Sequence, residues 1–191
     1  MAKKLREQLR DFIHGKEILD IERVGFIDLD DKPVRFYSSL SHVCVKIRIP
    51  RADNKYIEIE HTVADFGEGL QFIYALYVRL IDEIRFPDDY EDEPDMINCV
   101  SSIEQEVLLF PDGRNVIDDI IFHGLIEKED AIICGALEIV ADKNLIFFDP
   151  INFDGTLIGG EAKKQDWIEK FKFQNDGKLP QMVSLFENLN G

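Results

Sequence analysis

The stretch VCVKIRIP (residues 43–50), followed by RADNK (residues 51–55) and YIEIEH (residues 56–61), decides what fold to expect. Apolar and polar side chains alternate in the first and third segments, which is the two-residue period of a half-buried β-strand. Five residues between two such segments suit a hairpin loop. The pattern therefore predicts an antiparallel hairpin with one dry and one wet face.

The charges on the wet face suggest a register for this hairpin. In one register, side chains of opposite charge lie opposite each other on the wet face, and aliphatic side chains lie opposite each other on the dry face. Both kinds of cross-strand pair stabilise a hairpin. The opposed pairs would then be Arg48 with Glu58, Lys46 with Glu60, and Ile47 with Ile59.

Further strands are expected on both sides of the hairpin. Upstream, FIDLDDKPVRFY (residues 26–37) contains a DDKP turn between two short strands. Downstream, residues 115–149 read as a β-meander with turns at KED and ADKN, although VIDDIIFHG could instead be a short helix that Gly124 ends. Gly135, within an apolar run, predicts a bulge or a close backbone contact.

Other segments have the period of helices. EGLQFIYALYVRLIDEIRF predicts one long buried helix at about residues 67–86, ended by Pro87, whose aromatic side chains we interpret as core rather than as a ligand pocket. Amphipathic patterns predict an N-terminal helix that Gly15 ends and two C-terminal helices, in EAKKQDWIEKF (residues 161–171) and LPQMVSLFENL (residues 179–189).

These elements predict an α+β fold in which mainly antiparallel sheet is packed by the long helix and by the terminal amphipathic helices. A length of 191 residues suits a single domain. Two lobes, residues 1–86 and 96–191, joined by the acidic segment 87–95, are the alternative.

The net charge of −16 is concentrated in the middle of the chain. Residues 82–155 contain 20 acidic and four basic side chains, whereas residues 1–81 contain 13 of each and residues 156–191 five of each. A negative field repels nucleic-acid phosphate and anionic membranes and attracts basic proteins. The charge therefore disfavours direct nucleic-acid or membrane binding; it favours either a basic partner or a simple role in solubility.

The segment PDDYEDEP (residues 87–94) is the centre of this charge. It lacks the glycine and the alternating ligand pattern of a calcium loop, so we expect no metal or cofactor there. We interpret the segment as a surface for a basic partner, with an aromatic anchor among the acids. The candidate partner-binding residues are Asp88, Asp89, Tyr90, Glu91, Asp92, Glu93 and Asp95.

The cysteines and the N-terminus indicate in which cellular compartment the protein resides. Cys44, Cys99 and Cys134 are odd in number and far apart, which argues against a disulfide framework and for a reducing compartment. The charged N-terminus has no signal-peptide core, and the longest apolar run, residues 70–78, is far shorter than the roughly 20 residues of a membrane span. We expect a cytoplasmic protein.

One segment carries an enzymatic alternative. In FFDPINFDGTLIGGEAKK (residues 147–164), Asp149 or Asp154 ends an apolar strand and is followed by Glu161 and Lys163. This arrangement resembles the D…(D/E)-x-K constellation of restriction-endonuclease-like nucleases. The resemblance implies a magnesium ion held by two carboxylates and a lysine that helps to activate water. The overall charge and the short spacing oppose this reading.

Three functions follow, in order of preference. The first is an acidic interaction domain, of the kind that inhibits a basic nuclease or nucleic-acid-binding protein as an immunity protein or a phosphate mimic does. The second is a metal-dependent hydrolase that uses Asp149, Glu161 and Lys163. The third is a small-ligand-binding domain. A catalytic pair of Cys134 and His123 is disfavoured, because an apolar setting makes a thiol unreactive.

Overall fold

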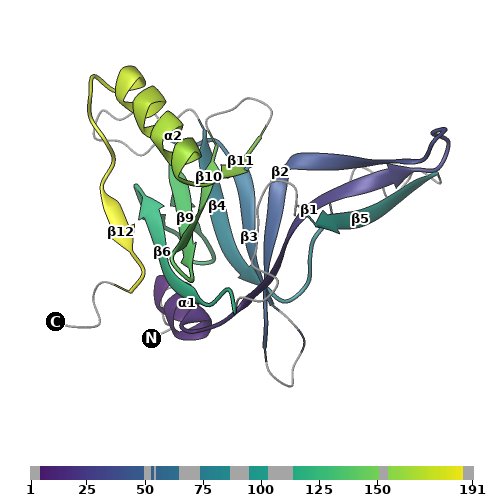
Figure 1. Ribbon diagram of the computed structural model, residues 1–191, viewed down its shortest axis with the longest axis horizontal. Coiled ribbons are helices and arrows are strands. Elements are labelled where there is room, and N and C mark those ends of the chain that lie inside the picture. The colour runs from purple at the N-terminus through teal and green to yellow at the C-terminus, as the bar shows by residue number, and fades with distance from the viewer. Residues whose placement is uncertain are drawn as a thin grey trace.

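The computed structural model describes residues 5–49, 53, 55–64, 74–86, 95–102, 114–150 and 155–186. These residues form an α+β fold of two antiparallel sheets and two helices (Figure 1). The elements are α1 (Leu5–Ile13), β1 (Ile18–Asp28), β2 (Arg35–Ile47), β3 (Lys55–Thr62), β4 (Ala75–Ile81), β5 (Met96–Ser102), β6 (Ile117–His123), β7 (Ile126–Glu127), β8 (Ile132–Cys134), β9 (Ala136–Ala141), β10 (Asn144–Asp149), β11 (Leu157–Gly159), α2 (Glu161–Gln174) and β12 (Met182–Ser184).

The larger sheet has seven strands in the order β5-β1-β2-β3-β4-β8-β7, and the smaller has five in the order β11-β10-β9-β6-β12. Gly135 separates β8, in the larger sheet, from β9, in the smaller one. The chain therefore changes sheets at this glycine, which was expected to mark a bulge or a close backbone contact.

The main core lies between the two sheets and takes aliphatic side chains from both. Val43, Val45, Ile57 and Ile59 of the larger sheet and Ile139 of the smaller sheet are all fully buried in it. Helix α1 adds its buried face, Leu5, Leu9 and Ile13, to the same cluster. Burial of each such side chain stabilises the fold by about 1.5–3 kcal/mol.

Helix α2 covers the opposite face of the smaller sheet (Figure 1). Trp167 and Phe171 of α2 form a second buried cluster with Ala136 and Phe147. Residues of β9 therefore alternate between the main core and the helix, as the two-residue strand period requires. The layers are the larger sheet, the core, the smaller sheet and α2.

The hairpin is present as strands β2 and β3, but the predicted register is wrong. Glu58 lies opposite Cys44, and Ile59 lies opposite Val43, a shift of four residues from the predicted pairing. Because the shift is even, every side chain keeps its predicted face. The charges find partners on other strands: Arg79 of β4 binds Glu58, which the two-strand argument did not consider.

The prediction of one long buried helix at about residues 67–86 is wrong for the second half of that range. Residues Ala75–Ile81 form strand β4, which pairs with β3 on one side and with β8 on the other. A short run that is apolar on both faces is compatible with a buried strand as well as with a buried helix. Residues 65–73 lie outside the described residues.

The second C-terminal helix, expected at residues 179–189, is also wrong. Met182–Ser184 form β12, an edge strand that pairs with β6, and the amide of Leu185 donates to the carbonyl of Ile120. The open edge of β6 supplied backbone partners that the local periodicity could not indicate. Residues 187–191 lie outside the described residues.

Within the part of the chain that the structure describes, no helix is both long enough and apolar enough to cross a lipid bilayer.

Candidate functional site

Strands β1, β2 and β5 continue beyond the body of the protein as a three-stranded ribbon (Figure 1). A register shift between β1 and β2 separates ribbon from body: Arg23 pairs with Val43, whereas Gly25 pairs with Ser38. Residues 39–42 of β2 therefore bulge opposite Val24 alone. Such bulges bend a strand and increase its twist. We call residues 25–38 together with β5 the ribbon.

The ribbon depends on a close contact at Gly25. A Cβ atom on Gly25 would lie 2.1 Å from the carbonyl oxygen of Tyr37 and 2.7 Å from the ring of Phe36. Only glycine leaves the backbone and the Phe36 ring room to approach so closely. On the other face, the rings of Phe26 and Tyr37 stack with centroids 5.2 Å apart.

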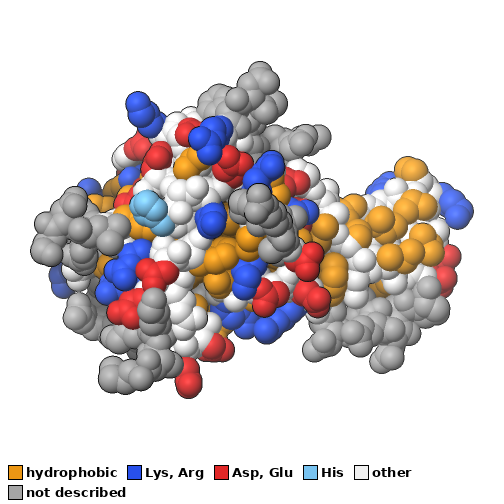
Figure 2. Space-filling model, turned by 90° about the horizontal axis from the view of Figure 1, so that it is seen from below, with side chains coloured by type: hydrophobic (Ala, Val, Ile, Leu, Met, Phe, Trp, Pro, Cys, Tyr) orange, Lys and Arg blue, Asp and Glu red, His pale blue; other side chains and the backbone are white. Residues whose placement is uncertain are grey.

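The ribbon exposes an unusual number of large apolar side chains. Those that belong to it are between 38% and 52% exposed, and Figure 2 shows hydrophobic side chains gathered on the projecting part of the molecule. They are Leu29, Val34, Tyr37, Ile97 and Val100. Strand alternation places Ile97 and Val100 on opposite faces, so both faces of the ribbon carry exposed apolar side chains. Exposed apolar surface of this kind is typical of a site for another macromolecule.

The distal end of the ribbon carries a small excess of negative charge. Residues 28–35 hold three acids and two bases: Asp28, Asp30, Asp31, Lys32 and Arg35. The amide of Leu29 in this turn donates to the carbonyl of Asp95, at 2.9 Å. The exposed Asp95 is the last residue of the acidic segment, so the end of that segment is attached to the turn.

Tyr37 connects the apolar and acidic parts of the ribbon. Its hydroxyl donates a short hydrogen bond to the carboxylate of Asp31. This hydrogen bond raises the pKa of the Tyr37 phenol. The tyrosine therefore presents one apolar ring face beside Phe26 and a neutral hydroxyl directed to an aspartate.

The other predicted partner-binding residues, Asp88, Asp89, Tyr90, Glu91, Asp92 and Glu93, lie outside the described residues. Their part in binding stays a prediction. The exposed apolar residues of the ribbon were not predicted from the sequence.

Many acidic residues of the body are engaged locally. Asp82 binds Lys55 at 2.6 Å and Glu127 binds Arg6 at 3.3 Å. The carboxylate of Asp118 accepts a hydrogen bond from the amide of Lys143. Red and blue side chains accordingly alternate over much of the body in Figure 2. At these positions the negative charge is balanced by a neighbouring base or bound by a backbone amide.

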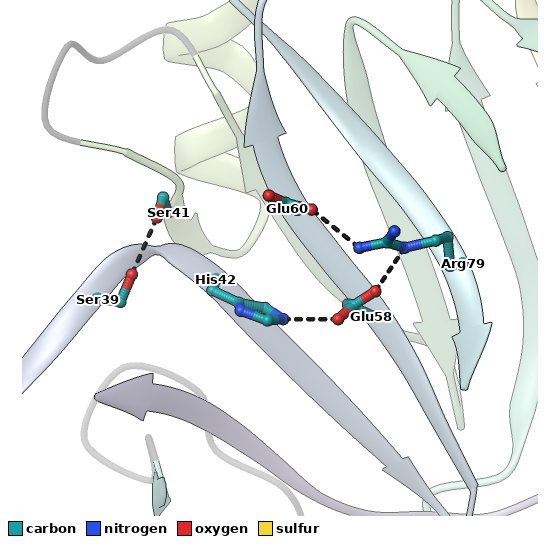
Figure 3. A network of polar contacts seen from close by, with 6 residues as sticks. All are labelled: Ser39, Ser41, His42, Glu58, Glu60 and Arg79. Carbon is teal, nitrogen blue, oxygen red and sulfur yellow. Dashed lines mark hydrogen bonds and ion pairs between the residues drawn. The ribbon is translucent and has the colours of Figure 1, made fainter. Parts of the chain in front are cut away.

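A buried polar network lies where the ribbon joins the body (Figure 3). Glu58 is fully buried and accepts hydrogen bonds on both carboxylate oxygens, from His42 Nε2 at 2.9 Å and from Arg79 Nε. The Arg79 guanidinium also donates to Glu60, at 2.9 Å. His42 is the last residue of the β2 bulge, so the network connects the bulge to β3 and β4.

The network sets the ionisation of Glu58. Burial alone would raise the pKa of this carboxyl, but the hydrogen bond from His42 and the charge of Arg79 outweigh burial, so the pKa is lowered. Glu58 is therefore a carboxylate at neutral pH, with both oxygens occupied. Such a group holds strands β2, β3 and β4 together.

Cys44 lies directly opposite Glu58, fully buried. Burial, with a further contribution from the charge of Glu58, raises the pKa of its thiol far above the ordinary value. Cys134 is equally buried and its pKa is raised by burial as well. Neither thiol is a nucleophile at neutral pH, which agrees with the expectation of core cysteines.

A second histidine–glutamate pair lies under α2. The buried His123 makes a short hydrogen bond to Glu138, and Lys164 Nζ donates to the same carboxylate at 3.0 Å. Burial would raise the pKa of Glu138, but these two donors lower it overall. The His123 ring also packs edge-on against Trp167. This cluster fastens α2 to the sheet.

The three residues of the nuclease-like alternative are placed differently. Asp149 is fully buried at the end of β10, whereas Glu161 is exposed in the first turn of α2. Glu161 accepts a hydrogen bond from Gln165, and Lys163 lies 3.9 Å from Asp166, so each of the two has a polar partner within α2. Over the described ranges, no group of three or more His, Cys, Asp or Glu side chains is placed to hold a metal ion. Asp154 lies outside those ranges.

Comparison of the chain with models of protein families, with curated proteins and with solved structures finds no match.

Proposed function

We propose that this chain is a protein-interaction domain that binds a basic partner through the acidic end of its ribbon. The observation that carries the proposal is the Leu29–Asp95 hydrogen bond. It brings the end of the acidic segment to a turn in which three aspartates outnumber two bases, beside exposed apolar side chains.

Charge and apolar surface have separate roles in such a site. Carboxylates attract the lysine and arginine side chains of a partner and speed its association, while apolar contacts supply most of the affinity. A nuclease or another nucleic-acid-binding protein has a basic surface of the required kind. Inhibition of such a protein is the specific role that we favour.

The test is capture of partners from the native host at low and at high salt. We expect the wild-type protein to retain a basic protein at low salt and to release it at high salt. Neutralising Asp88, Asp89, Glu91, Asp92 and Glu93 should weaken binding at least tenfold. Neutralising five exposed acids outside the ribbon should change it little; these are Glu129, Glu161, Asp166, Glu169 and Asp176. Equal, salt-independent capture by both variants would refute the proposal.

The hydrolase alternative stays a separate prediction with its own test. Incubation of plasmid DNA with Mg²⁺ or Mn²⁺ compares the wild type with the variant Glu161→Ala. Metal-dependent cleavage that the substitution abolishes would support it. The buried position of Asp149 and the separate contacts of Glu161 and Lys163 favour the interaction function over this one.

A further inference from the structure

The two faces of the ribbon differ in charge. Residues that lie opposite each other on neighbouring strands share one face of a sheet. One face carries Asp28 and Arg35, opposite each other, and the stacked rings of Phe26 and Tyr37. The other face carries no charged side chain over residues 25–28, 35–38 and 96–99, and we call it the uncharged face. Its residues are Gly25, Ile27, Phe36, Ser38, Ile97 and Cys99.

The uncharged face continues a side of β1 that forms core in the body of the protein. The pairing of β1 is regular over residues 22–28, so every second residue lies on the same side of the strand. On that side Ile21 is buried in the main core, between the two sheets. Among the helices and strands that the structure describes, only β1, β2 and β5 extend into the ribbon, and none of the others covers it (Figure 1). Ile97 is 48% exposed there, and Ile27 and Phe36 are half-buried.

We propose that the uncharged face binds the same face of a second copy of this chain, so that two ribbons pack face to face about a two-fold axis. Sheets pack in this way, about 10 Å apart, when the side chains between them are apolar. This inference goes beyond the proposed function, which concerns the charged groups of the ribbon and a different protein.

Charge favours a second copy over the basic partner on this face. In a two-fold contact each patch meets an identical patch, so a charged side chain would lie near its own copy and be repelled by it. The uncharged face avoids this repulsion between two chains that each carry a net charge of −16. A lysine or arginine of a basic partner would, in contrast, lose its water here without meeting a carboxylate, which is costly.

The contact is small, so the dimer should be weak and reversible. Two residues on each of three strands cover roughly 200 Å² of sheet, from strand spacings of about 4.8 Å and a rise of about 3.3 Å per residue. A standard interface buries about 800 Å² on each partner. The exposed Leu29 and Val34 in the adjoining turn add apolar surface beside the face. We therefore expect a dimer whose population depends on protein concentration.

Sedimentation velocity of the full chain over a range of concentrations, at low and at high salt, tests the proposal. We expect the monomer to convert to a dimer as concentration rises. Salt should strengthen the dimer, because it screens the repulsion between two acidic chains, whereas it should weaken binding of a basic partner. A monomer at every concentration and salt would overturn the proposal and would leave the proposed function, which partner capture tests, unaffected.

Two matched substitutions on β5 locate the contact. Ile97 and Val100 are 48% and 38% exposed on opposite faces, so the same new charge is placed on each face in turn. We expect Ile97→Lys to weaken the dimer at least about tenfold, the effect of losing one buried apolar side chain, and Val100→Lys to leave it unchanged. A dimer that both variants retain, or that both lose equally, would contradict the assignment.

A measurement on the wild type keeps the proposal testable if Ile97→Lys fails to fold. Cys99 belongs to the uncharged face and is partly exposed. Its reaction with excess iodoacetamide should therefore slow as protein concentration rises and the dimer forms. A rate that stays constant while sedimentation shows a dimer would place the contact elsewhere and overturn the proposal.

Discussion

Leu29 and Asp95 are joined by a backbone hydrogen bond of 2.9 Å, which attaches the turn between β1 and β2 to the residue before β5. The two residues belong to segments far apart in the sequence: Asp95 ends the acidic segment, whereas Leu29 lies in a turn whose three aspartates are accompanied by two bases. The contact therefore attaches the acidic segment to the distal end of the ribbon. The predictions below concern the ribbon that carries this end and the network at its base.

Substitution of Gly25 should distort the ribbon. In Gly25→Ala the new methyl group would meet the carbonyl oxygen of Tyr37, a backbone atom that cannot rotate away. We expect a loss of about 1–3 kcal/mol in the free energy of unfolding, the usual range for overpacking, measured by urea denaturation. Gly160→Ala is the control, since its Cβ would lie 3.6 Å from the nearest carbonyl, an ordinary contact. Equal effects of the two substitutions would contradict the described packing.

Removal of the Glu58 carboxylate should be costly. In Glu58→Ala, the buried His42 and the guanidinium of Arg79 both lose their shared acceptor. Breaking a buried ion pair from one side typically costs about 3–5 kcal/mol. Glu60→Ala removes the more exposed partner of Arg79 and should cost at most about 1 kcal/mol. Denaturant unfolding of both variants measures the difference, and a larger loss in the Glu60 variant would be inconsistent with the network.

The lowered pKa of Glu58 and of Glu138 gives stability a defined pH dependence. Both carboxyls ionise more readily in the folded protein than at the ordinary value of 4.5. Their contribution is therefore complete above about pH 4.5 and is lost as pH falls through the folded-state pKa values. Unfolding free energies measured from pH 7 down to pH 3 should show this fall. In Glu58→Gln the slope should be smaller, and an unchanged slope would contradict the assignment.

Thiol reactivity should distinguish the three cysteines. Cys44 and Cys134 are fully buried, whereas Cys99 on β5 is partly exposed. Burial raises the pKa of all three thiols, so modification is best followed at mildly alkaline pH. A disulfide reagent should modify one thiol in the folded protein and three after denaturation. The variant Cys99→Ser should lose the fast reaction, whereas rapid reaction of two thiols in the native wild type would refute the described burial.

The sequence allowed some elements to be predicted and not others, for identifiable physical reasons. The meander strands of residues 115–149 and the faces of the β2–β3 hairpin follow from local alternation. The register of the hairpin does not follow from local alternation. Glu58 pairs with Arg79, and Arg79 lies in a segment whose sequence predicts a helix but which forms strand β4. Cross-strand charge pairing cannot be assigned before the neighbouring strands are known.

The apolar site was missed for a related reason. Ile97 and Val100 lie in MINCVSS, whose asparagine and serines weaken the strand signal, and this segment becomes a strand through pairing with β1. Exposure of an apolar side chain is a property of the fold, so no local pattern could indicate it. The acidic segment, by contrast, was visible in composition alone.

Amide hydrogen exchange tests the central claim, that the ribbon is the docking surface, most directly. Exchange is compared for the wild-type protein alone and in complex with the basic partner that it retains at low salt. We predict slower exchange in the complex at residues 25–38 and 95–102, with no change in α2. Protection confined to α2 or to the smaller sheet, or exchange in the ribbon that the partner leaves unaltered, would contradict the claim.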